Sequence, residues 1–155
     1  MSTPDSSASF GGLAQAFLSR IGQPADLANE VSGFEFECGA YTVSVAPVGG
    51  AKIMVEVSVT VLQPDEAASA PLLMTLHRLN ALARAEHGWV TTIDDDNTLL
   101  LSALFPPGEL DPNSLEAAIV TAIDRAEVLS ALVARLLTET DEDHPTPPGT
   151  NHLRG

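Results

Sequence analysis

The chain has 155 residues, with 21 Asp and Glu against 7 Lys and Arg, so its formal net charge is -14. This charge excludes nucleic acid and anionic membrane surfaces as partners, because both would be repelled. A single cysteine, Cys38, excludes an intramolecular disulfide.

The start of the chain has neither the basic nor the apolar segment of a signal peptide. No apolar run approaches the roughly 18 residues that a membrane helix needs. We therefore expect a cytoplasmic protein without membrane insertion. The small polar residues 1–8 predict a disordered N-terminus, residues 9–137 predict one domain, and the acidic, then proline-rich residues 138–155 predict a disordered tail.

The first predicted element is a short amphipathic helix that ends at Gly22 and Pro24. Its apolar stripe consists of Phe10, Leu13, Phe17 and Ile21. Apolar residues then recur at every second position in "FEFEC" (34–38), "YTVSV" (41–45) and "IMVEVSVTVL" (53–62). Strict alternation with β-branched residues predicts three antiparallel strands with one solvated face, on which Glu35 and Glu37 lie.

A leucine-rich helix is predicted from about Pro71 to Glu86, with Ser69 as its N-cap. Two strand-like runs, "WVTTI" and "TLLLSALF", follow, and a last helix runs from Pro112, after the cap Asp111, to about Leu137. Its core stripe is Leu115, Ile119, Ala122, Ala126, Leu129 and Val133. The order α-β-β-β-α-β-β-α predicts an α+β fold, a twisted antiparallel sheet with helices packed on it.

The run Asp94–Asp96 could be a metal site, a carboxylate cluster or a turn. Its spacing does not fit a calcium loop, because Leu99 stands where glycine is needed and Phe105 where glutamate is needed. Adjacent acids on an extended chain also point to opposite sides. The two flanking alternating runs favour a hairpin turn at Asp95, Asp96 and Asn97.

No other constellation indicates catalysis or a cofactor. His77 and His87 are too far apart for one ligand face, and no zinc motif is present. Cys38 could be a nucleophile, but it shares the apolar face of its strand with Phe34 and Phe36, which favours a structural thiol. We therefore predict no enzyme, no metal and no cofactor.

Two apolar features exceed what a one-layer core requires. One is the first helix, and the other is the second face of the 71–86 helix, which carries Met74, Arg78, Ala81 and Ala85. Such surfaces on a charged protein mark protein binding or self-association, although both could instead complete the core.

The element order resembles the small, acidic chaperones of bacterial type III secretion, the Tir-chaperone-like group. The resemblance rests on "SFGGLAQAFLSRIG" (9–22), "LLMTLHRLNALARAEHGWVTTIDDDNTLLLSALFP" (72–106) and "LDPNSLEAAIVTAIDRAEVLSALVARLL" (110–137). It implies a homodimer that binds the N-terminal segment of a secreted effector in extended form, without ATP, and keeps it competent for secretion.

The resemblance also implies site residues. The effector-binding candidates are Leu13, Phe17, Ile21, Phe34 and Phe36. The candidate dimer contacts are Met74, Arg78, Ala81, Ala85 and Trp89. Because the same fold occurs outside secretion, a chaperone-like regulatory domain that binds a folded partner or a small ligand is the alternative.

Overall fold

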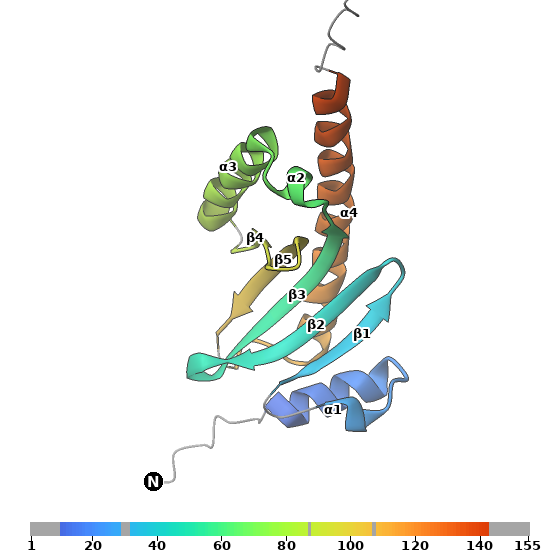
Figure 1. The fold of residues 1–155 in the computed structure, drawn as a ribbon. Helices are drawn as coiled ribbons and strands as arrows, with labels where there is room; N and C mark the ends of the chain where they lie inside the picture. Colours follow the sequence, from blue (N-terminus) through green and yellow to red (C-terminus); the bar gives the residue numbers. More distant parts are fainter. Residues whose placement is uncertain (1–9, 29–31, 87, 107, 143–155) are drawn as a thin grey trace, which may run out of the picture.

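The computed structural model describes residues 10–28, 32–86, 88–106 and 108–142, and both predicted disordered ends lie largely outside these ranges. The chain forms a five-stranded sheet with helices packed on it (Figure 1). The elements are α1 (Phe10–Arg20), β1 (Phe34–Cys38), β2 (Tyr41–Val48), β3 (Lys52–Val61), α2 (Pro64–Ala67), α3 (Ala70–Glu86), β4 (Val90–Ile93), β5 (Thr98–Phe105) and α4 (Pro112–Glu142). The predicted α+β class and the order of the main elements are confirmed.

The sheet has the strand order β1-β2-β3-β5-β4, and every neighbouring pair is antiparallel. The two-residue turn Gly39–Ala40 joins β1 to β2, with Gly39 at φ 62°. Gly33 lies directly before β1 at φ 82°, pressed against β2. A Cβ atom there would overlap the Val45 carbonyl and lie 2.6 Å from the Ala46 Cα.

The acidic run forms the predicted hairpin turn between β4 and β5. Asp94 Oδ1 accepts hydrogen bonds from the backbone N–H groups of Asp96 (2.9 Å) and Thr98 (2.8 Å). Asn97 supplies the left-handed conformation, with φ 59°, that its short polar side chain tolerates. The Asp94 carboxylate is therefore used to hold the turn.

The core lies between one face of the sheet and α4, which crosses that face (Figure 1). The α4 stripe predicted from the sequence is buried throughout, with no member more than 6% exposed. Opposite it lie Val43, Val45, Val55, Val57, Leu99 and Leu101 of the three central strands. The sheet face and the helix stripe thus cover each other, as a two-layer fold requires.

A bulge in β3 changes the predicted alternation near its end. The register passes from Ser58↔Leu100 to Thr60↔Leu99, which leaves Val59 as the extra residue. Beyond a bulge the two faces of a strand exchange. Val61, predicted to share the buried face, is therefore 69% exposed, and Leu62 is buried instead.

Two helices differ from their predicted extents. The segment "QPDEAAS" (63–69), for which we predicted neither helix nor strand, contains α2, because Gln63 and Glu66 form a reciprocal capping box around Pro64. Helix α4 continues five residues beyond Leu137, into the segment predicted to be disordered. The Arg135–Glu139 ion pair (3.0 Å), one turn apart, supports this extension.

Candidate protein-binding surfaces

Four phenylalanine rings gather where α1 meets β1. Phe34 lies 5.8 Å from Phe17 and 6.2 Å from both Phe10 and Phe36, measured between ring centroids. Phe17 also lies 6.0 Å from Phe36. The helix repeats every 3.6 residues, which places Phe10 and Phe17 on one face of α1, and the strand repeats every two residues, which places Phe34 and Phe36 on one face of β1. These two faces meet. We call Phe10, Phe17, Phe34 and Phe36 the phenylalanine cluster.

The predicted effector-binding residues divide into a buried and an accessible set. Phe17 and Phe34 are 1% and 4% exposed and form the floor of the cluster. Leu13, Ile21 and Phe36 pack against the core but remain partly exposed. Phe10 belongs to the same cluster, and only its place in the helical stripe indicated this from the sequence. Apolar surface at these three positions is therefore accessible to a partner.

Helix α1 is fixed to the start of α4 by polar contacts. Arg20 Nε lies 2.8 Å from Glu116 Oε2, and both side chains are about half exposed. A second guanidinium nitrogen of Arg20 donates to Asn113 Oδ1. These contacts orient α1 beside β1, although exposed ion pairs of this kind contribute only about 0–1 kcal/mol.

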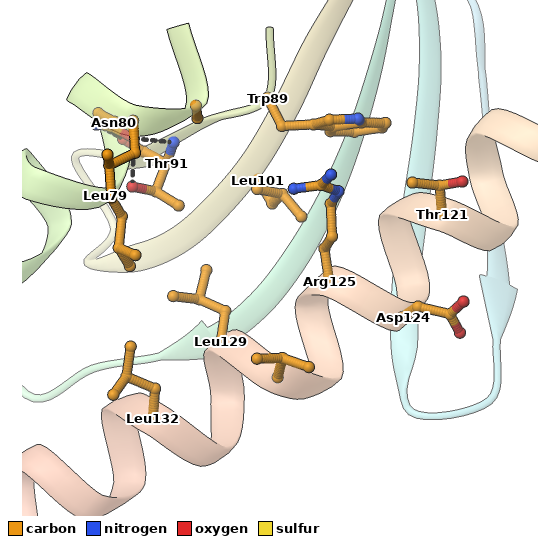
Figure 2. Close-up of a pocket in the computed structure, with 13 residues that line it drawn as sticks. Leu79, Asn80, Trp89, Thr91, Leu101, Thr121, Asp124, Arg125, Leu129 and Leu132 are labelled. Atoms are coloured by element: carbon orange, nitrogen blue, oxygen red, sulfur yellow. Dashed lines mark hydrogen bonds between the residues drawn. The ribbon is translucent and has the colours of Figure 1, made fainter. Parts of the chain in front are cut away.

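A second apolar surface surrounds a pocket between α3 and α4, which we call the α3–α4 pocket (Figure 2). Its volume is about 570 Å³. The lining is mainly aliphatic and comprises Leu79, Asn80, Leu82, Ala83, Trp89, Thr91, Leu101, Thr121, Asp124, Arg125, Val128, Leu129 and Leu132. Leu82 and Val128, at 62% and 71% exposed, bring apolar surface from the pocket to solvent.

The predicted dimer residues lie partly beside this pocket and partly inside it. Met74 is 55% exposed, and Arg78 and Ala81 are also exposed on the outer face of α3. Trp89 is only 6% exposed, because it lines the pocket and packs edge-on against Phe105 at 6.2 Å. The side chain of Ala85 lies outside the described part of the structure. Helical spacing places Leu82 between two faces of α3, the outer face that carries Met74 and the face that lines the pocket.

Asn80 fixes α3 to the sheet. Its Oδ1 accepts from the Thr91 backbone N–H and its Nδ2 donates to the Thr91 carbonyl, both at 2.8 Å. The Thr91 hydroxyl donates to the same Oδ1, also at 2.8 Å. Sequence reasoning missed this residue, because an asparagine in the middle of a helix reveals no partner eleven residues away.

The His, Cys, Asp and Glu side chains of the described ranges do not gather into a metal-binding cluster. None of the described residues form a group of three or more His, Cys, Asp or Glu that could hold a metal ion. The free thiol of Cys38 is partly exposed at the end of β1. Burial in the sheet, and next Asp94, raise the pKa of Glu56 above its ordinary value. No helix of the described part is long and apolar enough to cross a membrane.

An antiparallel sheet with two accessible apolar surfaces, one over the phenylalanine cluster and one around the α3–α4 pocket, defines a protein-binding module. Residues 12–130 match the sequence profile of the Tir chaperone protein (CesT) family. The chain belongs to this family, which confirms the resemblance seen in the sequence. Among curated protein sequences none gives a significant match.

Solved structures share the fold at low sequence identity. The structure of the ExsC–ExsE complex matches with TM-score 0.67 and 19% identity over 79% of this chain and 92% of that chain. The Yersinia pestis type III secretion chaperone SycH, in complex with a stable fragment of YscM2, matches with TM-score 0.62 and 17% identity over 78% of this chain and 99% of that chain. The HopA1–SchA chaperone–effector complex matches with TM-score 0.66 and 8% identity over 84% of this chain and 99% of that chain.

Proposed function

We propose that this chain is a cytoplasmic, non-enzymatic type III secretion chaperone, which binds a secreted effector and keeps it competent for secretion. The observation that carries the proposal is the match of residues 12–130 to the Tir chaperone family. Similar folds occur in structures described as a type III secretion chaperone and as a chaperone–effector complex. The accessible apolar surfaces support it further, because surfaces of this kind mark protein-binding sites.

The effector would bind over the phenylalanine cluster through its N-terminal segment, in extended form and without ATP. Leu13, Ile21 and Phe36 offer apolar contacts, and the buried Phe17 and Phe34 give them a rigid floor. A partner that docks apolar side chains on a preformed surface gains affinity from burial and needs no chemical energy source.

We expect Leu13→Asp to abolish most effector capture, because it places a charge among the partly exposed apolar residues of α1. Ala16→Asp is the matched control, since Ala16 is exposed on the same helix. Capture is measured by co-purifying bound polypeptides from the native cell. Recovery of the N-terminal region of a secreted protein supports the function. Equal capture by both variants would move the binding surface elsewhere.

A second copy of the chain would cover the outer face of α3 and the α3–α4 pocket. Leu73, Met74 and Leu82 are 46%, 55% and 62% exposed on this helix, and the exposed Val128 of α4 lines the pocket together with Leu82. A two-fold arrangement would place the exposed α3 ridge of each copy over the pocket of the other. Such self-complementarity is what an isologous dimer requires.

Ala81→Asp tests the dimer by light scattering after gel filtration. A carboxylate at a close helix contact would be buried without a partner, so the variant should become monomeric at micromolar concentration. Ala134→Asp on the exposed side of α4 is the control, with the same helix-propensity cost. A wild-type chain that is already monomeric would overturn the dimer, and an unaffected variant would place its interface elsewhere.

The alternative function is a regulatory domain that binds a small ligand. One observation favours it, since a pocket of about 570 Å³ lies within the range of small-molecule sites. The Ala81→Asp variant separates the two, because a ligand site would survive in the monomer. Native mass spectrometry of the chain purified from its own cell would then reveal a bound small molecule.

A further inference from the structure

The α3–α4 pocket holds a cation among apolar side chains. Of its lining residues only Asp124 and Arg125 carry a charge, and Arg125 is partly buried. Within the ranges that the structure describes, the Arg125 guanidinium forms neither a hydrogen bond nor an ion pair. Removing a guanidinium from water without a counter-ion costs free energy, so this cation favours an anion inside the pocket.

Asp124, the preceding residue of α4, does not serve as that counter-ion. Consecutive residues on a helix do not face each other. Figure 2 shows the Asp124 carboxylate directed away from the Arg125 guanidinium, which extends toward Trp89. Asp124 is also exposed, so water and salt screen its charge more than they screen the charge of Arg125. The pocket is therefore locally cationic, although the whole chain has net charge -14.

The uncharged polar side chains of the pocket are already paired. Asn80 and Thr91 bind each other through hydrogen bonds of 2.8 Å. Thr121 Oγ1 donates to the Ala117 carbonyl at 2.9 Å. A polar group that already has its partner gains little from a ligand, whereas an unpaired group gains a new bond. Arg125 is therefore the group that would determine the charge of a bound ligand.

Leucine side chains line the other end of the pocket. Leu79, Leu129 and Leu132 lie away from Trp89 and Arg125 (Figure 2). Leu132 follows Arg125 by seven residues on α4, which is about 10 Å along the helix axis. The pocket, with a volume of about 570 Å³, thus fits an elongated small molecule with an anionic head and an aliphatic body.

We propose that the α3–α4 pocket binds a monocarboxylate with an unbranched aliphatic chain, whose carboxylate pairs with Arg125 and whose chain lies against the leucines of the other end. The planar guanidinium can donate two parallel hydrogen bonds to a carboxylate, which makes such pairs strong and directional. The inference goes beyond the proposed secretion role, because the effector is placed over the phenylalanine cluster. It gives the small-ligand alternative a chemical class.

Trp89 makes occupancy of the pocket observable, since it is the only tryptophan of the chain and lines the pocket. Its fluorescence is followed while the full chain is titrated with octanoate, octanol or octylamine, which share an aliphatic chain and differ in charge. We expect octanoate to bind most tightly. The net charge of -14 alone would attract cationic octylamine and repel octanoate, so tighter binding of octylamine would overturn the proposal. Equal binding of octanoate and neutral octanol would also overturn it.

Arg125→Gln tests the charged end of the site. It should weaken octanoate binding at least about tenfold, because a charge-assisted pair is lost, and leave octanol binding unchanged. Arg135→Gln is the matched control, since it removes the same charge from an exposed position of α4 outside the pocket. Equal losses of octanoate affinity in the two variants would overturn the proposal. Unchanged octanol binding shows that the pocket is intact, and the three ligands on the wild-type chain decide the matter if it is not.

The three titrations are repeated with Ala81→Asp, because the proposed second copy would cover the pocket. Octanoate binding that is tightest of the three in either chain supports the site. Failure of octanoate to bind both chains would overturn it.

Co-purification from the native cell distinguishes this inference from the proposed function. If octanoate does not bind while the wild type captures a secreted protein, the ligand proposal is wrong and the secretion role stands. If octanoate binds as expected while the wild type captures no secreted protein, the ligand site stands and the secretion role is wrong.

Discussion

The two long helices α3 and α4 share an apolar period but differ in where their apolar residues lie. Every member of the α4 stripe is buried against the sheet of its own chain. Helix α3 buries Leu72 and Leu76, yet leaves Leu73, Met74 and Leu82 about half exposed or more. Burying one such side chain is worth about 1.5–3 kcal/mol, so the exposed residues of α3 can still contribute to binding, whereas the α4 stripe already contributes to folding.

The difference teaches that helical periodicity alone does not separate core from interface. What separates them is the amount of sheet available, since α4 packs along the central strand β3 while α3 packs beside the short edge strand β4. Helix α4 is therefore the framework of the domain, and α3 is a surface element held by a few contacts.

The largest expected effect comes from truncating the framework. Leu115→Ala removes a side chain that is 0% exposed and should lower the free energy of unfolding by about 2–5 kcal/mol. Leu82→Ala makes the same chemical change at an exposed site and should change the free energy of unfolding by no more than about 0.5 kcal/mol. Both are measured by urea denaturation in the Ala81→Asp background, so that a second copy does not contribute. If both variants lost a similar free energy of unfolding, the proposed difference between a buried α4 stripe and an exposed α3 surface would be wrong.

Asn80→Ala should release α3 without disturbing α4. Thr91 N–H and C=O would lose their partners in a part-buried site, at a cost of about 1–3 kcal/mol. Hydrogen exchange should then accelerate at the Thr91 amide and along α3, with α4 unchanged. A Thr91 amide that stays protected would mean that other contacts hold the helix.

Asp111→Ala should weaken the start of α4 in a pH-dependent way. Hydrogen bonds from the Ser114 backbone and hydroxyl lower the pKa of Asp111. A lowered pKa stabilises the fold above the unfolded pKa of about 3.9, and this contribution is lost as the pH falls through the folded value. The variant should therefore melt below the wild type at neutral pH, and the difference in melting temperature should become smaller in acid. Asp111→Asn, which keeps the cap without a charge, should not change with pH in this way.

The smallest effect is expected at Glu56, on the solvent side of the sheet. Its raised pKa means that the ionised carboxylate is less favourable in the folded chain, so its contribution to stability falls as the pH rises through the folded value. Glu56→Gln should slightly raise the melting temperature at neutral pH and change nothing below the ordinary glutamate pKa of about 4.3. A variant that is less stable at neutral pH would contradict this reading.

The features that could be predicted from the sequence depend on local periodicity. The α4 stripe, the β3 alternation up to Val57 and the turn around Asn97 each follow from spacing within one segment. The bulge at Val59 and the Asn80–Thr91 contact could not be predicted, because each depends on the register between distant segments. The same reason explains why Trp89 lies inside the α3–α4 pocket and not beside Met74 on the exposed face.

Gly33 has a consequence for how this domain can vary. Gly22, Gly39, Gly88 and Gly108 also have positive φ, but a Cβ atom at any of them would meet nothing within 4 Å. At Gly33 both the dihedral angle and the β2 backbone exclude a side chain. In a saturation library read out by folding, these four positions should accept asparagine with modest loss. Gly33 should accept no replacement, because any side chain would lift β1, and the edge it presents, off the sheet.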